Sequence, residues 1–227
     1  MSRDGQRALD CGRLQSIAVD CRREEWGIRR ATGEWVARAA ALTASGALVV
    51  VPTETVYGVA ARAGDAGAME RLYAAKGRDA GKPVALMAAD AAGVRRDGAE
   101  WGKAAEKLAV AFWPGALTMV LKKGEGWTGY RVPDHPVALD WLRRLSFLPA
   151  VTSANLSGEP AATTAEAAWE ALKGRVALVL DDGPSPGGVA SAVVRVDGTR
   201  VELLRGGALA GALREMAGKE GWEWVER

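Results

Sequence analysis

Hydrophobic and polar positions follow two different periods along this chain, and together they predict a mixture of helices and strands. Residues 47–51 and 176–180 are short, continuously apolar runs of the kind that form buried strands. In residues 65–76 the apolar side chains Met69, Leu72 and Tyr73 recur at intervals of three and four, which predicts an amphipathic helix. Gly77 then stands where a left-handed helix cap is expected.

The same periodicity covers most of the remaining chain. Further helices are predicted over residues 34–43, 103–112, 137–145 and 163–172. Further strands are predicted over residues 84–87, 117–121, 149–152, 192–196 and 201–204. Thr163 and Glu166 match a capping box at the start of the last helix. Because strands and helices alternate without a linker or repeat, the pattern predicts a single α/β domain. Residues 1–25 lack periodicity, which predicts a flexible N-terminal extension.

Composition narrows the range of functions without changing the fold class. The chain has 227 residues, with 30 basic and 28 acidic side chains. This balance disfavours a dedicated nucleic-acid binder, although a local basic cleft remains compatible with it. A single histidine, His135, excludes a multi-histidine metal site. Two cysteines, Cys11 and Cys21, are too few for a zinc cluster or a disulfide framework, so we expect free thiols.

Neither a membrane span nor a signal peptide is expected. No apolar run approaches the roughly 20 residues that a spanning helix needs. The first ten residues carry charges where a signal peptide has an apolar core. The sequence therefore predicts a cytoplasmic protein without membrane contact.

One apparent nucleotide motif is rejected. Gly124–Gly129 matches G-x-G-x-x-G, which binds pyrophosphate only where a helix follows directly. The next residues, Tyr130–Pro133, are extended in character and end in a proline. We therefore predict a flexible loop at residues 124–129.

Polar and basic residues gather where two early elements end. Pro52–Gly58 (PTETVYG) directly follows a buried strand, where ligands of open α/β sheets collect; a turn with two capping threonines is the alternative. Lys76 continues the apolar face of its helix, and Arg78 and Lys82 follow it. We expect the Lys76 stem to lie against the core and its ammonium to emerge at the helix end. A simple interaction with the helix dipole would also explain this lysine.

Two later stretches have the same character. Val151–Gly158 (VTSANLSG) runs from a predicted strand into small hydrogen-bonding side chains, which also suit an ordinary turn. Gly187–Ser191 and Arg205–Gly207 are glycine-rich and basic, so they permit close approach of an anion or form a mobile loop.

In their order along the chain, six motifs resemble the YrdC/Sua5 family of threonylcarbamoyl-AMP synthases. These motifs are PTETVYG, KGR…KP, FWPGALT, RVPDHP, SANLSG and GGVAS…LLRGG. The resemblance covers roughly residues 26–210 and leaves residues 211–227 as a C-terminal helix and tail. The chain has no room for the additional C-terminal domain of the longer Sua5 form, so it is similar to the short, single-domain form.

The resemblance implies a YrdC-like α/β fold: a twisted, open, mostly mixed sheet flanked by helices, with ATP and L-threonine on its concave face. It further implies that the threonine amine captures bicarbonate or CO2 and that the carbamate attacks the α-phosphorus of ATP, with Mg²⁺ bridging phosphate oxygens. The product, threonylcarbamoyl-adenylate, would pass to a transferase complex that modifies adenosine 37 of tRNA.

The resemblance also implies residue roles. Catalysis falls on Lys76, Arg78, Ser153 and Asn155. ATP binding falls on the same four residues together with Lys82 and Arg205. Threonine binding falls on Thr55, Arg131 and Ser191, and no residue is implied as a metal ligand.

Some positions depart from the family pattern. Met87 stands where a threonine-contacting histidine is common, and Trp127 stands where a nucleotide-contacting threonine is common. Ala161 and Ala192 replace a serine and a threonine. Two alternatives therefore remain open: an RNA-binding module of the same fold that contacts tRNA or double-stranded RNA, and an ATP-using enzyme that activates a different carbamate.

Overall fold

The computed structural model describes residues 27–226, so the predicted N-terminal extension and both cysteines lie outside the described residues. The helices are α1 (Gly33–Ala44), α2 (Ala66–Lys76), α3 (Ala91–Arg96), α4 (Lys103–Phe112), α5 (Pro136–Arg143), α6 (Ala165–Leu172) and α7 (Ala210–Glu220), with the 3₁₀ turn η2 (Gly207–Leu209). The strands are β1 (Gly27–Arg30), β2 (Val49–Val51), β3 (Gly58–Ala61), β4 (Ala85–Met87), β5 (Leu117–Lys123), β6 (Gly126–Arg131), β7 (Ala150–Ser153), β8 (Leu178–Asp181), β9 (Ala192–Asp197), β10 (Arg200–Arg205) and β11 (Glu223–Glu226).

Each predicted helix and strand is confirmed to within a few residues, but two local predictions are wrong. The N-cap of α6 is Thr164, whose hydroxyl accepts a hydrogen bond from the Ala167 N–H at 3.1 Å. Thr163 instead bonds through its backbone carbonyl to Ser185 N–H. Residues 124–129 are not a flexible loop: β6 begins at Gly126 and pairs antiparallel with β5. Gly124, at a φ of 56°, makes the tight hairpin turn.

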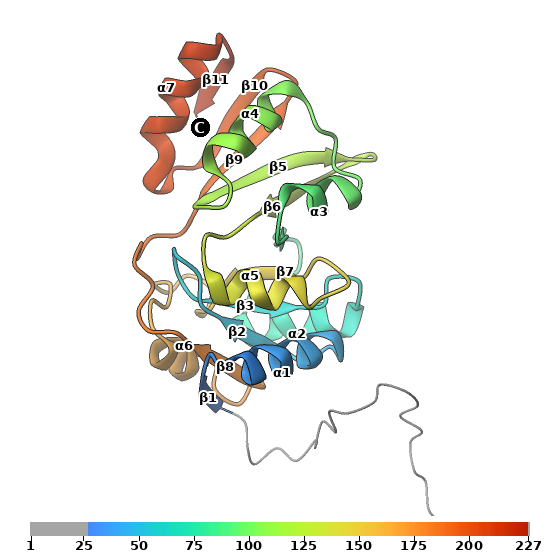
Figure 1. Ribbon diagram of the computed structural model, residues 1–227, viewed down its shortest axis with the longest axis vertical. Coiled ribbons are helices and arrows are strands. Elements are labelled where there is room, and N and C mark those ends of the chain that lie inside the picture. Colours follow the sequence, from blue (N-terminus) through green and yellow to red (C-terminus); the bar gives the residue numbers. More distant parts are fainter. Residues whose placement is uncertain (1–26, 227) are drawn as a thin grey trace, which may run out of the picture.

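Over residues 27–226 the strands form one eleven-stranded mixed sheet in the order β1-β8-β2-β3-β7-β4-β6-β5-β9-β10-β11 (Figure 1). We call β1, β8, β2, β3 and β7 the lower group and β6, β5, β9, β10 and β11 the upper group. The short strand β4 joins them, antiparallel to β7 and parallel to β6. This confirms the predicted α/β class and the mixed sheet.

The lower group is covered by helices on both faces. Val49 and Val51 of β2 pack with α1 and α5, whereas Val50, between them, packs with α2 and α6. This alternation follows from the period of two along a strand, and it explains why the run at residues 47–51 is continuously apolar.

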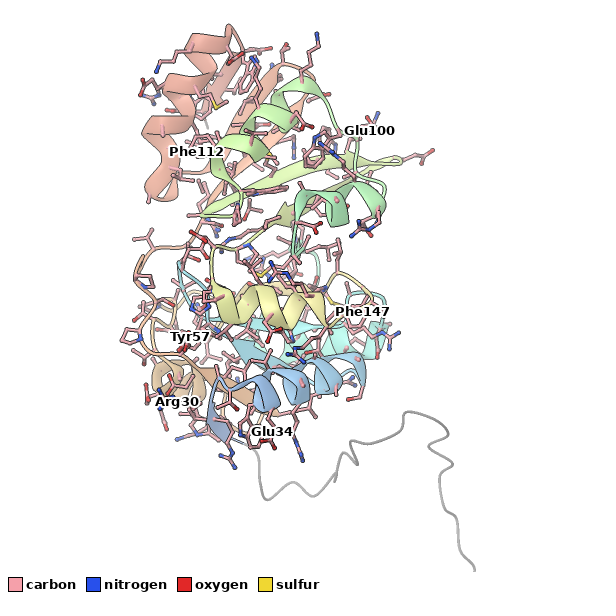
Figure 2. The ribbon with its side chains drawn as sticks, viewed as in Figure 1. Arg30, Glu34, Tyr57, Glu100, Phe112 and Phe147 are labelled. Carbon is pink, nitrogen blue, oxygen red and sulfur yellow. The ribbon has the colours of Figure 1, made fainter. Side chains whose placement is uncertain are left out.

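The upper group is covered by helices on one face. Leu117, Met119 and Leu121 of β5 pack with α4 and α7, and the alternate residues Thr118 and Val120 point to the opposite face. Figure 1 shows α3, α4 and α7 beside the upper strands, and Figure 2 shows labelled Phe112 of α4 among them. The opposite face of the upper group is therefore free to form a binding surface.

The C-terminal segment belongs to this sheet. After α7, β11 pairs parallel with β10, and Trp222 and Trp224 pack against the core of the upper group. No helix within residues 27–226 is long and apolar enough to cross a bilayer.

Gly58, at the start of β3, provides a test of the packing between β3 and β7 in the lower group. A Cβ atom built on Gly58 would lie 2.7 Å from Val151 Cγ1. We expect Gly58→Ala to lower the free energy of unfolding by about 1–3 kcal/mol through overpacking. In a Val151→Ala background this cost should shrink, because the clashing methyl is gone. Denaturant unfolding of all four proteins measures the difference, with Gly64→Ala as the uncrowded control; an equal cost in both backgrounds would contradict the contact.

Candidate active site

A cavity of about 360 Å³ lies on the uncovered face of the sheet, where the lower and upper groups meet. Figure 2 shows side chains filling the region between the two groups, with Tyr57 labelled in the lower one. The lining residues that matter below are Gly58, Arg78, Met87, Thr118, Trp127, Arg131, Ser153, Ser191, Arg195 and Arg205. Hydroxyl and guanidinium groups thus share one hollow with small and apolar side chains.

The strand register places polar groups at two ends of the cavity floor. At the first end Met87, Arg131 and Thr118 are direct neighbours on β4, β6 and β5. Trp127 lies at the second end on β6, and Ser153, two residues beyond the Ala85–Val151 pair of β4 and β7, lies toward the same end. Trp127 precedes Arg131 by four residues on the same strand, which separates the two ends by roughly 13 Å at about 3.3 Å per residue. Val120 and Gly129 form a smooth floor between them.

Arg131 is fixed by three acceptors at the first end. Its Nη2 donates to Glu54 Oε1 at 2.7 Å and to Thr55 Oγ1 at 2.8 Å, and its Nε donates to Gly115 O at 3.2 Å. Its Nη1 makes no hydrogen bond with any residue of 27–226. Arg131 is 5% exposed, so the guanidinium is pre-oriented with one nitrogen left for a ligand.

Arg205 is a second cation at this end. Its Nε donates to Ser191 O at 3.0 Å, and Nη2 lies 3.3 Å from Ser191 Oγ, which also bonds Thr118 Oγ1 at 2.8 Å. Burial, followed by repulsion from Arg131 and Arg78, lowers the Arg205 pKa from its ordinary value. Within residues 27–226 neither Arg205 nor Arg78 forms an ion pair. The cavity therefore has an excess of positive charge, which favours anionic ligands.

Lys76 corrects one expectation. Its ammonium does not emerge at the helix end but is buried, with the residue 2% exposed. Its Nζ donates to Ser153 O at 2.5 Å and to Asn155 O at 2.6 Å. Burial and the nearby Arg78 lower the pKa of Lys76 to about 8. Lys76 is not among the cavity-lining residues, so it lies behind the residues that form the cavity wall.

The four residues proposed for catalysis thus divide into two pairs. Lys76 and Asn155 lie behind the wall, where Asn155 Nδ2 donates to Leu156 O and Glu159 O, both at 2.7 Å. Arg78 and Ser153 line the cavity, and the left-handed Gly77, as predicted, turns the chain between Lys76 and Arg78. The buried pair shapes the turn after β7, and the other pair faces the ligand space.

Some of the remaining predicted residues line the cavity and others do not. Thr55 lies behind Arg131, and Lys82 is exposed and does not line the cavity. Of the positions that depart from the family pattern, Met87 and Trp127 line the cavity, whereas Ala161 and Ala192 do not.

Sequence reasoning assigned no role to Glu54, Thr118 or Arg195. Glu54 stands inside the PTETVYG motif and Thr118 ends the FWPGALT motif, so their motifs were the available signal. Arg195, which lies over the Trp127 ring at 5.2 Å from its centroid, had no such signal. Among residues 27–226 no group of three or more His, Cys, Asp or Glu side chains is arranged to hold a metal ion.

The loop that carries Ser191 is tied to the PTETVYG segment. Gly187 N–H donates to Glu54 O at 2.8 Å, and a Cβ on Gly187 would lie 2.7 Å from that same oxygen. Only glycine permits this approach. Two glycine-containing motifs that are distant in sequence therefore form one wall of the cavity.

Residues 41–207 match the Sua5/YciO/YrdC family model, which is described as Telomere recombination. The chain belongs to the Sua5/YciO/YrdC family. It is 37% identical over 185 residues to the threonylcarbamoyl-AMP synthase of Bacillus subtilis, covering 77% of this chain and 54% of that protein. The synthase of Pyrococcus abyssi is 38% identical over 204 residues, covering 85% and 57%.

A solved Sua5/YciO/YrdC structure agrees with this assignment. Pyrococcus abyssi Sua5 in complex with L-threonine superposes with a TM-score of 0.79 at 34% identity, covering 87% of this chain and 61% of that one. This chain spans between half and two thirds of the length of these relatives. The shared region contains the whole cavity described above.

The buried Lys76 makes this family member's stability depend on pH in a defined window. Between the folded pKa of about 8 and the ordinary value of 10.5, the unfolded chain binds more protons than the folded one. The unfolding free energy contributed by this group therefore rises as pH increases across that window. Denaturant unfolding from pH 7 to pH 10 should show wild type gaining stability relative to Lys76→Met. A difference that is constant with pH would contradict a buried, charged ammonium.

Proposed function

We propose that this protein makes threonylcarbamoyl-adenylate from L-threonine, bicarbonate and ATP, with release of pyrophosphate. The main observation in its favour is one cavity with cationic groups at both ends: Arg131 and Arg205 at the first, and Arg195 over Trp127 at the second. Arg131 and Trp127 lie roughly 13 Å apart along β6. Such a cavity suits two anionic substrates that must meet in the middle. The names of the relatives and the L-threonine complex of the Pyrococcus abyssi protein support threonine and ATP as those substrates.

The proposed reaction has two bond-forming steps. The threonine amine forms a bond to the carbon of bicarbonate with loss of water, which gives a carbamate. A carbamate oxygen then attacks the α-phosphorus of ATP, the bond from that phosphorus to the β-bridging oxygen breaks, and pyrophosphate leaves. The protein supplies no covalent nucleophile, so it acts by positioning and by stabilising charge.

Each end of the cavity takes one substrate in this proposal. Arg131, with Thr55 behind it and Ser191 beside it, binds the threonine carboxylate through the unpaired Nη1. Arg78 and Ser153 bind phosphate oxygens at the second end, and Arg205 reaches the nucleotide from the first. Charge-assisted hydrogen bonds of this kind offset the desolvation of the phosphates and the carboxylate.

The other predicted residues act at a distance from the ligands. Lys76 and Asn155 hold the turn after β7, and the Lys76 ammonium adds positive charge behind Arg78. We propose that exposed Lys82 contacts the outermost phosphate. Mg²⁺ would enter with the triphosphate as part of the substrate, coordinated by phosphate oxygens.

The product's fate is part of the same proposal. Threonylcarbamoyl-adenylate would pass to a transferase complex that modifies adenosine 37 of tRNA in the cytoplasm. In this view tRNA receives the product, and direct contact with tRNA or double-stranded RNA is not required for adenylate formation.

The direct test incubates the protein with ATP, bicarbonate and L-threonine and follows pyrophosphate release together with the product mass. We expect release that requires all three substrates. No release with any amino acid, accompanied by salt-dependent RNA binding, would favour the RNA-binding alternative.

Removal of the buried Lys76 ammonium should lower the activity without unfolding the protein. Lys76→Ala should lower adenylate formation by about 10²-fold or more, because charge and support are lost behind the phosphate site. Circular dichroism should confirm that the variant folds. Lys173→Ala, which removes an exposed lysine at the C-cap of α6, is the matched control. Wild-type turnover in Lys76→Ala would remove Lys76 from the proposed machinery.

A substitution at Glu54 should weaken the binding of threonine but not of ATP, because Glu54 holds Arg131 in place. In Glu54→Gln we expect the KM for threonine to rise about 10-fold, since the Arg131–Glu54 ion pair is replaced by a weaker bond from the guanidinium to a neutral amide and Arg131 is held less firmly. The KM for ATP should stay within about 2-fold, because the phosphates bind at the other end. Steady-state kinetics with each substrate varied in turn gives both values. Equal changes in the two constants would show that Glu54 supports the fold rather than the threonine end.

A further inference from the structure

The side of the cavity next to Arg131 is formed by the apolar side chain of Met87, and we call this side the wall. Met87 on β4 is the direct parallel neighbour of Arg131 on β6, so their side chains lie on the same face of the sheet. Both residues line the cavity, and both are 5% exposed. Neighbouring strands lie about 4.8 Å apart, so a ligand carboxylate bound at Arg131 has Met87 on the adjacent strand beside it.

Met87 offers a ligand no hydrogen-bond donor and only a weak thioether acceptor. Its backbone N–H is occupied by Pro149 O at 3.0 Å. Behind it Met87 packs with Val137 and Val151, which carry no polar side-chain atoms. A hydroxyl placed against this wall gains contact but no hydrogen bond.

The hydroxyls of Thr53, Thr55, Thr118 and Ser191 all take part in hydrogen bonds with the protein's own groups. Thr53 Oγ1 donates to Val56 O at 2.6 Å and pairs with Thr55 Oγ1 at 2.9 Å. Ser191 and Thr118 pair with each other beside Arg205. Ser153 lies on β7 beyond the Ala85–Val151 pair, which places it toward the far end of the cavity and away from Met87. These contacts orient the arginines and leave the side chain of the ligand to be recognised by shape.

We propose that Met87 is a specificity-determining residue that makes this site select short, branched α-amino acids by shape. On this basis valine, which has the size and branching of threonine without its hydroxyl, is activated with comparable efficiency. The proposal rests on the proposed function, because it concerns the amino acid used in the same reaction. With valine the same bonds form and break, and the products are valylcarbamoyl-adenylate and pyrophosphate.

The selectivities typical of enzyme sites give the expected ratio of kcat/KM for threonine and valine. A site that hydrogen-bonds a substrate hydroxyl rejects the analogue without it by about 10⁴–10⁵-fold. A site that reads only size and shape distinguishes two isosteres far less, by about 10²-fold at most. For the wall at Met87 we expect kcat/KM for threonine and valine to differ by about 10-fold or less.

The experiment measures pyrophosphate release and product mass with threonine and valine for wild type, Met87→His and Met87→Leu. Met87→His supplies a donor and an acceptor at the wall, so it should raise the threonine preference by about 10-fold or more. Met87→Leu keeps the wall apolar and should leave the preference as in wild type. A wild-type preference for threonine above about 10²-fold would overturn the proposal, whether or not the variants fold.

Failure of the proposed function gives a different result. If neither amino acid supports pyrophosphate release, the synthase reaction is wrong. Calorimetric titration of threonine and valine into the unmodified protein then still tests the wall. Similar dissociation constants would support recognition by shape, and binding of threonine alone would overturn it.

Discussion

A buried ammonium group between two backbone carbonyls is the interaction on which the candidate site depends. Lys76 Nζ ties the end of α2 to Ser153 and Asn155 at the end of β7, and Ser157 N–H bonds back to Lys76 O at 2.8 Å. Two elements from different parts of the chain are thereby locked at the point where the sheet passes from the lower to the upper group. Gly77 and Arg78 follow directly, so the same lock aims Arg78 into the cavity.

The charges around the cavity are arranged for ligands rather than for the stability of the free protein. Arg131 is neutralised by Glu54, but Arg78 and Arg205 have no ion-pair partner within residues 27–226. Besides burial, repulsion from Arg78 lowers the pKa of both Lys76 and Arg205. Clustered like charges destabilise a fold unless an anion joins them. A carboxylate at one end and a triphosphate at the other would supply that anion, which connects the electrostatics directly to the proposed reaction.

The individual helices and strands could be predicted from the sequence better than the contacts between them. Buried strands such as Val49–Val51 and the helix ending at Lys76 follow from local periodicity, and the motifs identified most cavity residues. The burial of Lys76 could not be predicted, because its partners are carbonyls about eighty residues away. The neighbouring positions of Met87 and Arg131 depend on strand register, which local patterns do not determine. The same limit explains the wrong prediction for residues 124–129. Their glycine-rich composition suggested a flexible loop, but a two-residue turn pairs β6 with β5.

In the proposed reaction one cavity holds the amino acid at Arg131 and the phosphates at Arg78 and Ser153. A crystal structure of the protein with L-threonine and a non-hydrolysable ATP analogue would show whether it does. We expect both ligands in the cavity, with the carboxylate on Arg131 Nη1 and phosphate oxygens on Arg78 and Ser153. Either ligand bound outside this cavity, or the triphosphate on Arg131, would contradict it.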